Sequence, residues 1–406
     1  MTEIGTFSGT HVLAELEGID PALLDDSEFL RETLRSTVTE AGAVVCDVIA
    51  HRFAPHGVTV LALLAESHAS IHTYPELGAA FADVFTCGDK ADPELAVRLL
   101  GRALGTAAVR TSTSKRGNGG RLSESVGAGL TRSWDVREVV YGTRTGFQDL
   151  LIGRTAQGIS LFCDAERQST EATQLAYHEA LMVPAMLLAE HVRRVLIIGS
   201  SEGVASQLAV AQGASVVDHV DIDRTAVRAC AEYLPYGYTP EELAAAERGE
   251  GPVRVHYRDG WEFLAGAEPG YDVVVIDLPD ENDDADAQHN RLYGKDFLRR
   301  CADLLAPGGV VCSQGGCPTM WRDDTLIKAW QRFGDLFATP VYYGSAEHEW
   351  AFLSGRLDEL ADPAGTMIQR LAAAPYRPET LDADSLRAST IPPLRVRASG
   401  RPRPGA

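Results

Sequence analysis

Two groups of polar side chains in this 406-residue sequence have residue types and spacings suited to chemistry. The first is the run AESHASIHTYPE (65–76), which follows an apolar, β-rich segment. It offers a serine hydroxyl at Ser67 and an imidazole at His72, a nucleophile and a proton carrier. An isolated Ser–His pair has an ordinary interpretation too: a turn after a strand, with Ser67 as a cap and His72 half-buried.

The second group follows apolar runs in the second half of the chain. VLIIG leads into SSEG, and VDID follows about 20 residues later, a pattern typical of a nucleotide-binding strand, loop and helix. Gly199 and Gly203 would let the backbone approach a ligand, and Asp221 would face two ribose hydroxyls. Dehydrogenases and methyltransferases share this pattern. Asp277 and Asp280 lie in the acidic run DLPDENDDADAQ, whose composition alone favours solvated acids in a loop.

The elements that must position the first group form a small α+β unit over residues 10–110. HVLAELEG alternates like a strand, and DSEFLRETLRSTVTEAG has a helical period that ends at Gly42. AVVCDVIAHRF and VTVLALLAE are β-rich runs separated by PHG, a turn signal. ADPELAVRLLGRALG predicts a second amphipathic helix. One small sheet packed against helices is therefore expected.

A change of composition divides the chain. The segment TSTSKRGNGGRLSESVGAGL is rich in Gly and Ser, which predicts a flexible linker. We expect a first domain at 1–117, a linker at 118–134 and a second domain at 135–394. Residues 135–175 predict a β-rich subdomain, and alternating buried strands and helices then predict a doubly wound α/β sheet. The basic, Pro/Gly-rich residues 395–406 predict a disordered tail.

Composition limits the classes of function. The chain is 45% hydrophobic and 23% charged, with no run of roughly 20 apolar residues and no secretory signal, so neither a membrane protein nor a secreted one is expected. Seven scattered cysteines without a CxxC pair argue against disulfides or a metal site and favour a cytoplasmic protein. A net charge of −20 disfavours nucleic acid and would attract small polycations such as diamines, although it also serves solubility.

The first group belongs to a longer pattern. FAPHG, AESHASIHTYPE and DVFTCG follow one another at the spacing of bacterial S-adenosylmethionine decarboxylases, which residues 10–117 resemble. The resemblance implies that the bond between Glu66 and Ser67 breaks autocatalytically and that Ser67 becomes a pyruvoyl group. That carbonyl would form a Schiff base with the substrate amine and act as an electron sink. Thr59 stands where the family usually has a processing serine, so a hydroxyl is retained.

The same resemblance assigns the remaining roles of the first domain. His72 would handle protons during processing, and Cys87 would reprotonate the product carbon. Phe53 and Tyr74, the latter in place of a common tryptophan, would sandwich the adenine ring. Glu76 would bind the ribose or help to hold the site. Relatives that decarboxylate ornithine or arginine leave those two substrates as alternatives.

Residues 135 to about 394 resemble a spermidine synthase. The resemblance rests on LFCD leading to Gln168, YHE (177–179), the glycine loop, YRDG (257–260), IDLPD (276–280) and the ending YRPETLDADSLRASTIPP. It implies that an amine of putrescine displaces methylthioadenosine from decarboxylated S-adenosylmethionine. Asp277 would be the base, Tyr177 would support it and Asp280 would hold the attacking amine.

The resemblance assigns five further residues to the donor or the diamine. Glu202 would grip the aminopropyl ammonium and Asp221 the ribose; Asp259 would bind the adenine amine, and Gln168 and His178 the donor or the diamine. Three departures stand out: GSSEG replaces the usual GGGDG, Glu281 replaces a proline, and VYYGSAEHEW replaces the stretch that lines the amine pocket.

The sequence therefore predicts an α+β two-layer decarboxylase domain, a small β-rich subdomain and a Rossmann-like, methyltransferase-type α/β domain. We expect a bifunctional enzyme of polyamine synthesis that uses a self-derived pyruvoyl group and no metal, and that forms a homo-oligomer. Putrescine is the default acceptor, with spermidine, agmatine or another diamine as alternatives. A non-enzymatic alternative makes one domain a degenerate regulatory or oligomerising module.

Overall fold

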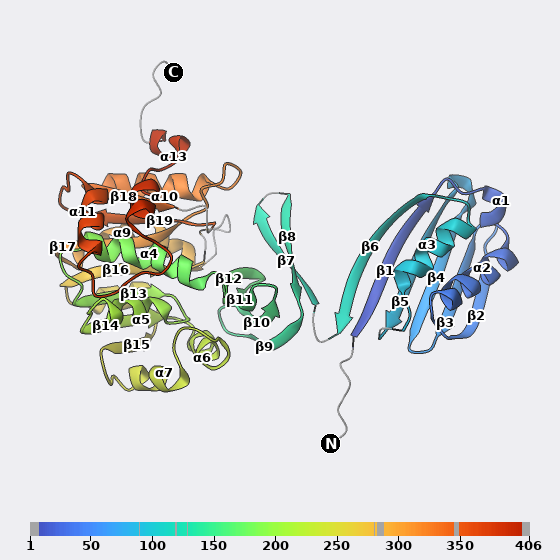
Figure 1. The fold of residues 1–406 in the computed structure, drawn as a ribbon, viewed down its shortest axis with the longest axis horizontal. Helices are drawn as coiled ribbons and strands as arrows, with labels where there is room; N and C mark the ends of the chain where they lie inside the picture. The colour runs from blue at the N-terminus through green and yellow to red at the C-terminus, as the bar shows by residue number, and fades with distance from the viewer. Residues whose placement is uncertain are drawn as a thin grey trace, which may run out of the picture. The chain divides into compact units, whose positions relative to one another are not determined.

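The computed structural model of the chain folds into two compact units, Met1–Leu122 with Ser133–Val139, and Ser123–Arg132 with Val140–Ala406 (Figure 1). The structure describes residues 8–88, 90–117, 120–127, 129–279, 281, 288–344 and 349–399. None of the helices in these ranges is long and apolar enough to cross a membrane.

Unit 1 is built on a six-stranded antiparallel sheet in the order β2-β3-β4-β5-β1-β6. Its strands are β1 (Ser8–Glu17), β2 (Val45–Arg52), β3 (Val58–Leu64), β4 (Ser67–Tyr74), β5 (Ala79–Cys87) and β6 (Ala108–Gly117). Its helices are α1 (Pro21–Leu24), α2 (Ser27–Glu40) and α3 (Pro93–Ala103), with a short 3₁₀ turn η1 (Pro75–Leu77). The predicted two-layer α+β domain is confirmed.

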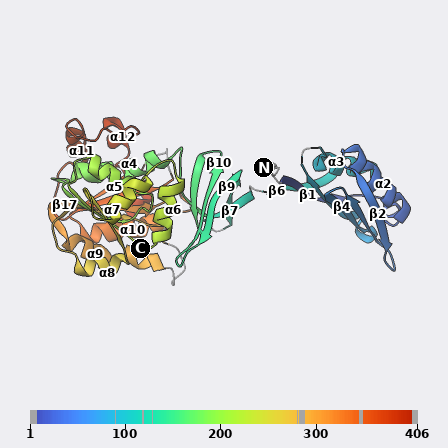
Figure 2. The same cartoon turned by 90° about the horizontal axis from the view of Figure 1, so that it is seen from below.

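One face of this sheet is covered and the other is open. Helices α2 and α3 lie on the same face of the sheet in both views (Figures 1 and 2). Each begins at an aspartate, Asp26 or Asp92, whose side chain accepts backbone N–H bonds and so caps the first turn. Alternate strand residues such as Val60, Ile71 and Val84 are buried under the helices, because side chains alternate across a strand.

The Gly/Ser-rich segment expected to be a linker contains regular structure. Strands β7 (Gly120–Gly127) and β8 (Leu130–Val136) pair as a two-stranded sheet. Residues 123–132 of this hairpin pack as part of unit 2. The small polar residues resemble a linker in composition, yet backbone pairing and contacts with unit 2 order them. The expected tail differs as well, since α13 (Leu394–Ala398) is helical and residues 400–406 lie outside the described ranges.

Unit 2 contains two further sheets. The smaller has the order β12-β11-β10-β9 and corresponds to the predicted β-rich subdomain; its strands are β9 (Glu138–Arg144), β10 (Asp149–Thr155), β11 (Gly158–Cys163) and β12 (Glu166–Thr170). The larger has the order β15-β14-β13-β16-β17-β19-β18; its strands are β13 (Arg194–Gly199), β14 (Val216–Asp221), β15 (Val253–Tyr257), β16 (Tyr271–Asp277), β17 (Leu305–Gly316), β18 (Thr339–Gly344) and β19 (Ala351–Arg356). Strands β13 to β17 are parallel, so the predicted doubly wound sheet is confirmed.

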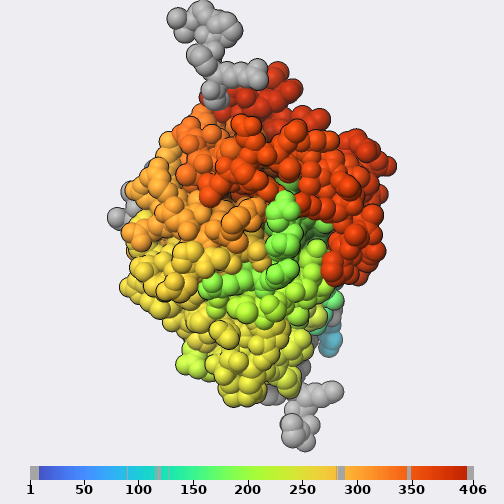
Figure 3. Space-filling view, turned by 90° about the vertical axis from the view of Figure 1, so that its left-hand side faces the viewer, coloured from blue at the N-terminus to red at the C-terminus, as the bar shows by residue number. Residues whose placement is uncertain are grey.

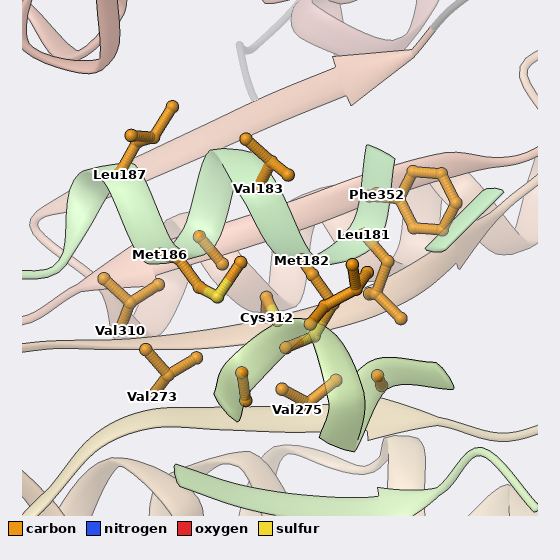
Figure 4. Packing of buried hydrophobic residues seen from close by; sticks show 14 of the residues in the cluster. Leu181, Met182, Val183, Met186, Leu187, Val273, Val275, Val310, Cys312 and Phe352 are labelled. Carbon is orange, nitrogen blue, oxygen red and sulfur yellow. The ribbon is translucent and has the colours of Figure 1, made fainter. Parts of the chain in front are cut away.

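Helices connect and cover these strands. They are α4 (Gln174–Leu188), α5 (Val204–Ala211), α6 (Arg224–Tyr233), α7 (Pro240–Glu247), α8 (Gly260–Gly266), α9 (Lys295–Asp303), α10 (Asp324–Leu336), α11 (Pro363–Leu371) and α12 (Ala383–Ala388), with a 3₁₀ turn η2 (Gln288–Tyr293). Helix α4 is apolar around most of its circumference because it is enclosed on several sides. Figure 4 shows Met182 and Met186 packed over Val273, Val275 and Cys312 of the sheet.

A buried carboxylate fastens the C-terminal segment to α4. Glu179 accepts bonds from the hydroxyl of Tyr376 (2.6 Å), the backbone N–H groups of Glu379 (2.8 Å) and Thr380 (2.7 Å), and the hydroxyl of Thr380 (2.5 Å). In the space-filling view the red C-terminal residues lie beside the green residues of α4 (Figure 3). The acid therefore fixes the base of the helix that carries Tyr177 and His178.

Candidate active sites

Ser67 lies at the first position of β4, after a tight turn that places it beside Cys87. Strands β3 and β4 are joined by Ala65 and Glu66, and Glu66 has φ +59°. That left-handed conformation is unfavourable for a residue with a side chain, so strain is stored next to the Glu66–Ser67 bond. The Ser67 hydroxyl oxygen accepts a hydrogen bond from the backbone N–H of Cys87 (3.0 Å).

His72 lies at the opposite end of β4 and on the open face of the sheet, whereas Ser67 has the parity of Ala69 and Ile71, which face the helices. Five residues of extended strand separate it from Ser67, about 16 Å at about 3.3 Å per residue. Its ring Nδ1 is 2.9 Å from the hydroxyl oxygen of Thr59, the residue directly opposite on β3. The hydroxyl retained at Thr59 thus lies beside the His72 ring. The motif residues that are close in sequence therefore form two separate clusters within one chain.

The predicted adenine-binding residues surround His72 rather than Ser67. Phe53 follows β2 and is 50% exposed, and Tyr74 ends β4 and is 37% exposed. Tyr74 makes an edge contact with Phe81 at 5.5 Å between ring centres, whereas Phe53 contacts His51. Glu76 pairs with His56 (3.0 Å). Both rings are accessible to a ligand, and their sandwich around adenine stays a prediction.

Three further polar side chains share the Ser67 end of the open face. His11 Nε2 lies 2.9 Å and His68 Nε2 3.4 Å from Asp83 Oδ1, so one carboxylate joins strands β1, β4 and β5. The three ligand atoms lie within 4.8 Å of one another, close enough in principle to share a cation. Ion pairing alone accounts for this arrangement, and the expected absence of a metal stays a prediction. Sequence reasoning did not single out His11, His68 or Asp83.

A cavity of about 270 Å³ opens at the carboxyl ends of the parallel strands of unit 2. Gly199 ends β13, Asp221 ends β14 and Asp277 ends β16. Eight of the nine predicted site residues line this cavity: Gln168, Tyr177, His178, Gly199, Glu202, Asp221, Asp259 and Asp277. The ninth, Asp280, lies outside the described residues.

The predicted base and its supporting tyrosine are in contact. The hydroxyl of Tyr177 donates to Asp277 Oδ1 at 2.7 Å. Burial raises the pKa of Asp277, and the charge of His178 and the bond from Tyr177 oppose the rise. His178 Nδ1 bonds to the carbonyl of Gln174 (2.7 Å), while its buried Nε2 has no partner among the described residues. One imidazole nitrogen is thus available to a ligand beside the carboxylate.

The glycine loop is shaped by close backbone approaches. Gly199 has φ +84°, and a Cβ there would clash with the backbone oxygen of Asp277. Gly203 has φ +82°, and a Cβ there would overlap the ring of Tyr238. Only glycine fits both requirements at each position. The loop therefore passes directly behind Asp277 and carries Glu202 into the cavity.

Asp221 is a buried carboxylate with two donors. Its oxygens accept bonds from the hydroxyl of Ser201 (2.7 Å) and the backbone N–H of Asp223 (2.8 Å). Burial raises the pKa of Asp221 to about 6; these two bonds oppose the rise, and the neighbouring charges of Asp223 and Glu202 add to it. The site is therefore built to favour ligand groups that can donate hydrogen bonds to this acid.

Asp259 already has protein partners for both oxygens. Oδ1 accepts the N–H groups of Trp261 (2.9 Å) and Glu262 (3.2 Å) and so caps α8, and Oδ2 pairs with Arg291. A contact with an adenine amine would compete with Arg291. The departure at Glu281 has a structural reason: Glu281 pairs with Arg332 of α10, which fixes the start of the acidic loop.

Several cavity residues escaped sequence reasoning. Phe147 and Gln148 come from the β-rich subdomain, and Gln148 donates to Asp223 (3.0 Å). Glu124 comes from the hairpin that was interpreted as a linker, and Trp350 from the run noted only as a departure from the family. Only the replacement of the amine-pocket stretch by VYYGSAEHEW gave a signal, and it did not say which side chain would be used.

Comparisons with known proteins match two different families to two separate parts of the chain. The family model described as S-adenosylmethionine decarboxylase matches residues 10–117. A proenzyme of this name from Prochlorococcus marinus (strain MIT 9313) is 55% identical over 97 residues, covering 24% of this chain and 78% of that protein. One from Clostridium tetani is 40% identical over 109 residues, covering 27% of this chain and 86% of that protein. The chain belongs to the S-adenosylmethionine decarboxylase family.

This decarboxylase family member carries a second enzyme domain. The family model described as spermine/spermidine synthase domain matches residues 174–345. A polyamine aminopropyltransferase from Aeropyrum pernix is 35% identical over 183 residues, covering 44% of this chain and about half (55%) of that protein. A spermidine synthase solved with the transition-state analogue AdoDATO aligns with a TM-score of 0.60 at 18% identity, covering 69% of this chain and 94% of that one. The spermidine synthase of Thermotoga maritima aligns with a TM-score of 0.58 at 17% identity over 69% and 93%. These two likenesses show the fold.

Proposed function

We propose that this enzyme makes decarboxylated S-adenosylmethionine in unit 1. Unit 2 then transfers the aminopropyl group to putrescine, giving spermidine and methylthioadenosine. The observation that carries the proposal is the pairing of Tyr177 with the buried Asp277 in a cavity that also contains the carboxylate Asp221. A proton acceptor thus lies beside a place for a nucleoside, as an aminopropyl transfer requires.

In unit 1 the chain's own atoms supply the processing step. The Ser67 hydroxyl attacks the Glu66 carbonyl carbon, the peptide C–N bond breaks, and the proton moves from the oxygen to the freed nitrogen, leaving an ester. Elimination then breaks the Cβ–O bond of the ester and releases Glu66 as a carboxylate. The enamine left at residue 67 becomes an imine, which water hydrolyses to a ketone with release of ammonia. The strained φ of Glu66 supports cleavage at this bond. The resulting pyruvoyl carbonyl would bind the substrate amine and accept the electrons released with CO₂.

In unit 2 the carboxylate prepares the nucleophile. Asp277 takes a proton from one ammonium of the diamine, because a protonated amine has no lone pair with which to attack. The neutral nitrogen then attacks the propyl carbon beside the sulfonium, the C–S bond breaks and its electron pair stays on sulfur. Tyr177 holds Asp277 in place by its 2.7 Å bond, and the raised pKa of Asp277 suits a proton acceptor near neutral pH.

A second copy of the chain is needed to complete the decarboxylase site. About 16 Å separates Ser67 from His72 along β4. The open face of the sheet, which carries His72, exposes large apolar side chains, among them Leu13, Ile49, Leu61, Leu63 and Phe81. An apolar face of this kind favours a protein partner. Pairing two such faces head to tail would bring the end of β4 that begins at Ser67 in one protomer toward His72 of another. All seven cysteines are free, in keeping with a cytoplasmic setting.

Mass spectrometry tests the processing step directly. The wild-type chain should yield a fragment of residues 1–66 and a remainder with a blocked amino terminus, and Ser67→Ala should stay intact. Co-expression of Ser67→Ala with His72→Ala tests the shared site. The His72→Ala chain should be cut only in the presence of its partner, and failure of that rescue contradicts assembly between copies.

Product analysis tests the two activities. With S-adenosylmethionine and putrescine, the processed chain should release CO₂, methylthioadenosine and spermidine; parallel assays with ornithine and arginine should release no CO₂. Asp277→Asn should slow transfer from supplied decarboxylated S-adenosylmethionine by about 10²- to 10⁴-fold, the range for loss of a general base. A transfer rate in Asp277→Asn equal to that of wild type would contradict the role of Asp277 as the base.

A further inference from the structure

The order of strands in the large sheet gives the cavity of unit 2 a direction. Asp221 ends β14 and Asp277 ends β16, two strands further along. Beyond Asp277 come Gln314 on β17 and Trp350, which directly precedes β19. The nucleoside side and the far side of the cavity therefore lie on opposite sides of Asp277. An acceptor amine that attacks from the side away from the donor extends toward Trp350.

Two charged side chains that line the cavity, Glu124 and Arg167, belong to a cluster that we name the arginine–glutamate wall: Glu124, Arg132, Arg167 and Glu349. Arg167 Nη2 donates to Glu349 (2.8 Å), and Arg132 also pairs with Glu349. Arg132 lies 3.6 Å from Glu124, whose carboxylate also accepts the backbone N–H of Arg167 (3.4 Å). The formal charges of the four side chains cancel.

Arg167 of this wall lies over an aromatic ring. The guanidinium of Arg167 lies 4.7 Å from the ring centre of Trp350, and its side chain is 9% exposed. Trp350 in turn contacts Tyr177 edge-on at 5.8 Å, so a continuous set of contacts joins the guanidinium to the catalytic carboxylate. Stacking and the bond to Glu349 leave the guanidinium little freedom to turn away from the cavity.

A guanidinium in the lining of a pocket for polyamines is unexpected. The acceptor is itself a cation, and like charges repel strongly where water is excluded. The two carboxylates of the wall already bind the two guanidiniums, so the wall offers no net negative charge to an additional ammonium. A short diamine can leave its second ammonium on the near side of Trp350. A triamine would have to press another ammonium against Arg167.

We propose that Arg167, held by Glu349 and Trp350, restricts the acceptor of unit 2 to short diamines and excludes triamines such as spermidine. This selectivity rests on the proposed aminopropyl transfer. It predicts that the enzyme stops after one transfer, so that spermidine leaves as the product rather than serving as the next acceptor.

Steady-state kinetics of the full chain, with decarboxylated S-adenosylmethionine supplied, test this restriction. The measured quantity is the ratio of kcat/KM for spermidine to kcat/KM for putrescine. Arg167→Met removes the charge at similar length and should raise the ratio at least tenfold. Arg167→Lys keeps the charge and should leave the ratio within threefold of wild type. The KM for the donor should stay unchanged in both, because Arg167 lies on the other side of Asp277.

A third variant acts in the opposite direction. Glu349→Gln removes the negative charge that lies 2.8 Å from Arg167, so the ratio should fall below that of wild type. A ratio unchanged in Arg167→Met, or an equal rise in Arg167→Met and Arg167→Lys, overturns the inference. Wild-type activity on spermidine equal to that on putrescine overturns it too. If wild type transfers to no amine at all, the proposed function fails instead. If Arg167→Met does not fold, the change of the kcat/KM ratio in Glu349→Gln still tests the inference.

Discussion

Replacing Asp221 by Asn should stabilise unit 2 while it impairs donor binding. Asp221 is 6% exposed, and burial raises its pKa from 3.8 to about 6. Ionising this acid therefore costs more in the folded chain than in the unfolded one, by about 3 kcal/mol at 1.36 kcal/mol per pKa unit. Asparagine keeps both bonds, since its oxygen can accept from Asp223 N–H and its amide can donate to Ser201.

The pH dependence fixes the sign of this effect. A carboxyl with a raised pKa binds its proton more tightly when folded, so it lowers the free energy of unfolding only once it ionises. In the wild type that loss should develop between about pH 4 and pH 6 and persist above. Asp221→Asn should therefore gain about 3 kcal/mol at pH 7.5 and nothing at pH 4. For a domain of this size the gain corresponds to a melting temperature about 5–10 °C higher.

Scanning calorimetry of the full chain across this pH range measures the change in the melting temperature of unit 2. The transition of unit 2 is the one that decarboxylated S-adenosylmethionine shifts to higher temperature. The same variant should raise the KM for the donor about 10- to 100-fold, since hydrogen bonds to a charged group contribute about 1.5–3 kcal/mol. Asp223→Ala is the control, because it removes the cap of α6 and the acceptor of Thr145 and Gln148, and should lower the free energy of unfolding by about 3 kcal/mol or more. Equal gains for Asp221→Asn at pH 4 and pH 7.5 would refute the reasoning.

Further predictions concern the base, the anchor of α4 and the glycine loop. The acid limb of the transfer rate should lie above the usual range of an aspartate because burial raises the pKa of Asp277, and Tyr177→Phe should move that limb to higher pH by removing a bond to the ionised form; pH–rate profiles measure both. Glu179→Ala should lower the free energy of unfolding by about 3 kcal/mol or more in denaturant titrations, since it leaves four donors without their acceptor, whereas an unchanged midpoint would contradict the anchoring role. Gly199→Ala should lower the free energy of unfolding by at least about 2 kcal/mol and reduce transfer activity. A melting temperature equal to that of wild type would show that the loop can rearrange to accept a Cβ.

The positions of the candidate residues on their strands could be predicted from the sequence. Two apolar runs separated by a short polar stretch place Ser67 at the start of a strand, because alternation and turn residues act over a few positions. Parallel strands present their carboxyl ends at one edge of a sheet, so Gly199, Asp221 and Asp277 had to meet once each was placed at a strand end.

The same local reasoning was wrong where order depends on distant contacts. The hairpin β7–β8 has the composition of a linker, but Arg132 in β8 pairs with Glu349, more than two hundred residues away. Likewise Ser67 and His72 are near neighbours in the sequence and yet lie at opposite ends of one strand. Neither the pairing of Arg132 with Glu349 nor the separation of Ser67 from His72 can be read from spacing along the chain.

The sequence by itself therefore determined which strands end beside the candidate residues and where glycine is required, because these follow from short-range backbone preferences. Only the tertiary structure decided that Glu179 fastens the C-terminal segment, that Arg167 lies over Trp350 and that burial raises the pKa of Asp221. The physical reason is that burial and charge pairing depend on which distant segments pack together. That packing sets the environment in which each side chain ionises and binds.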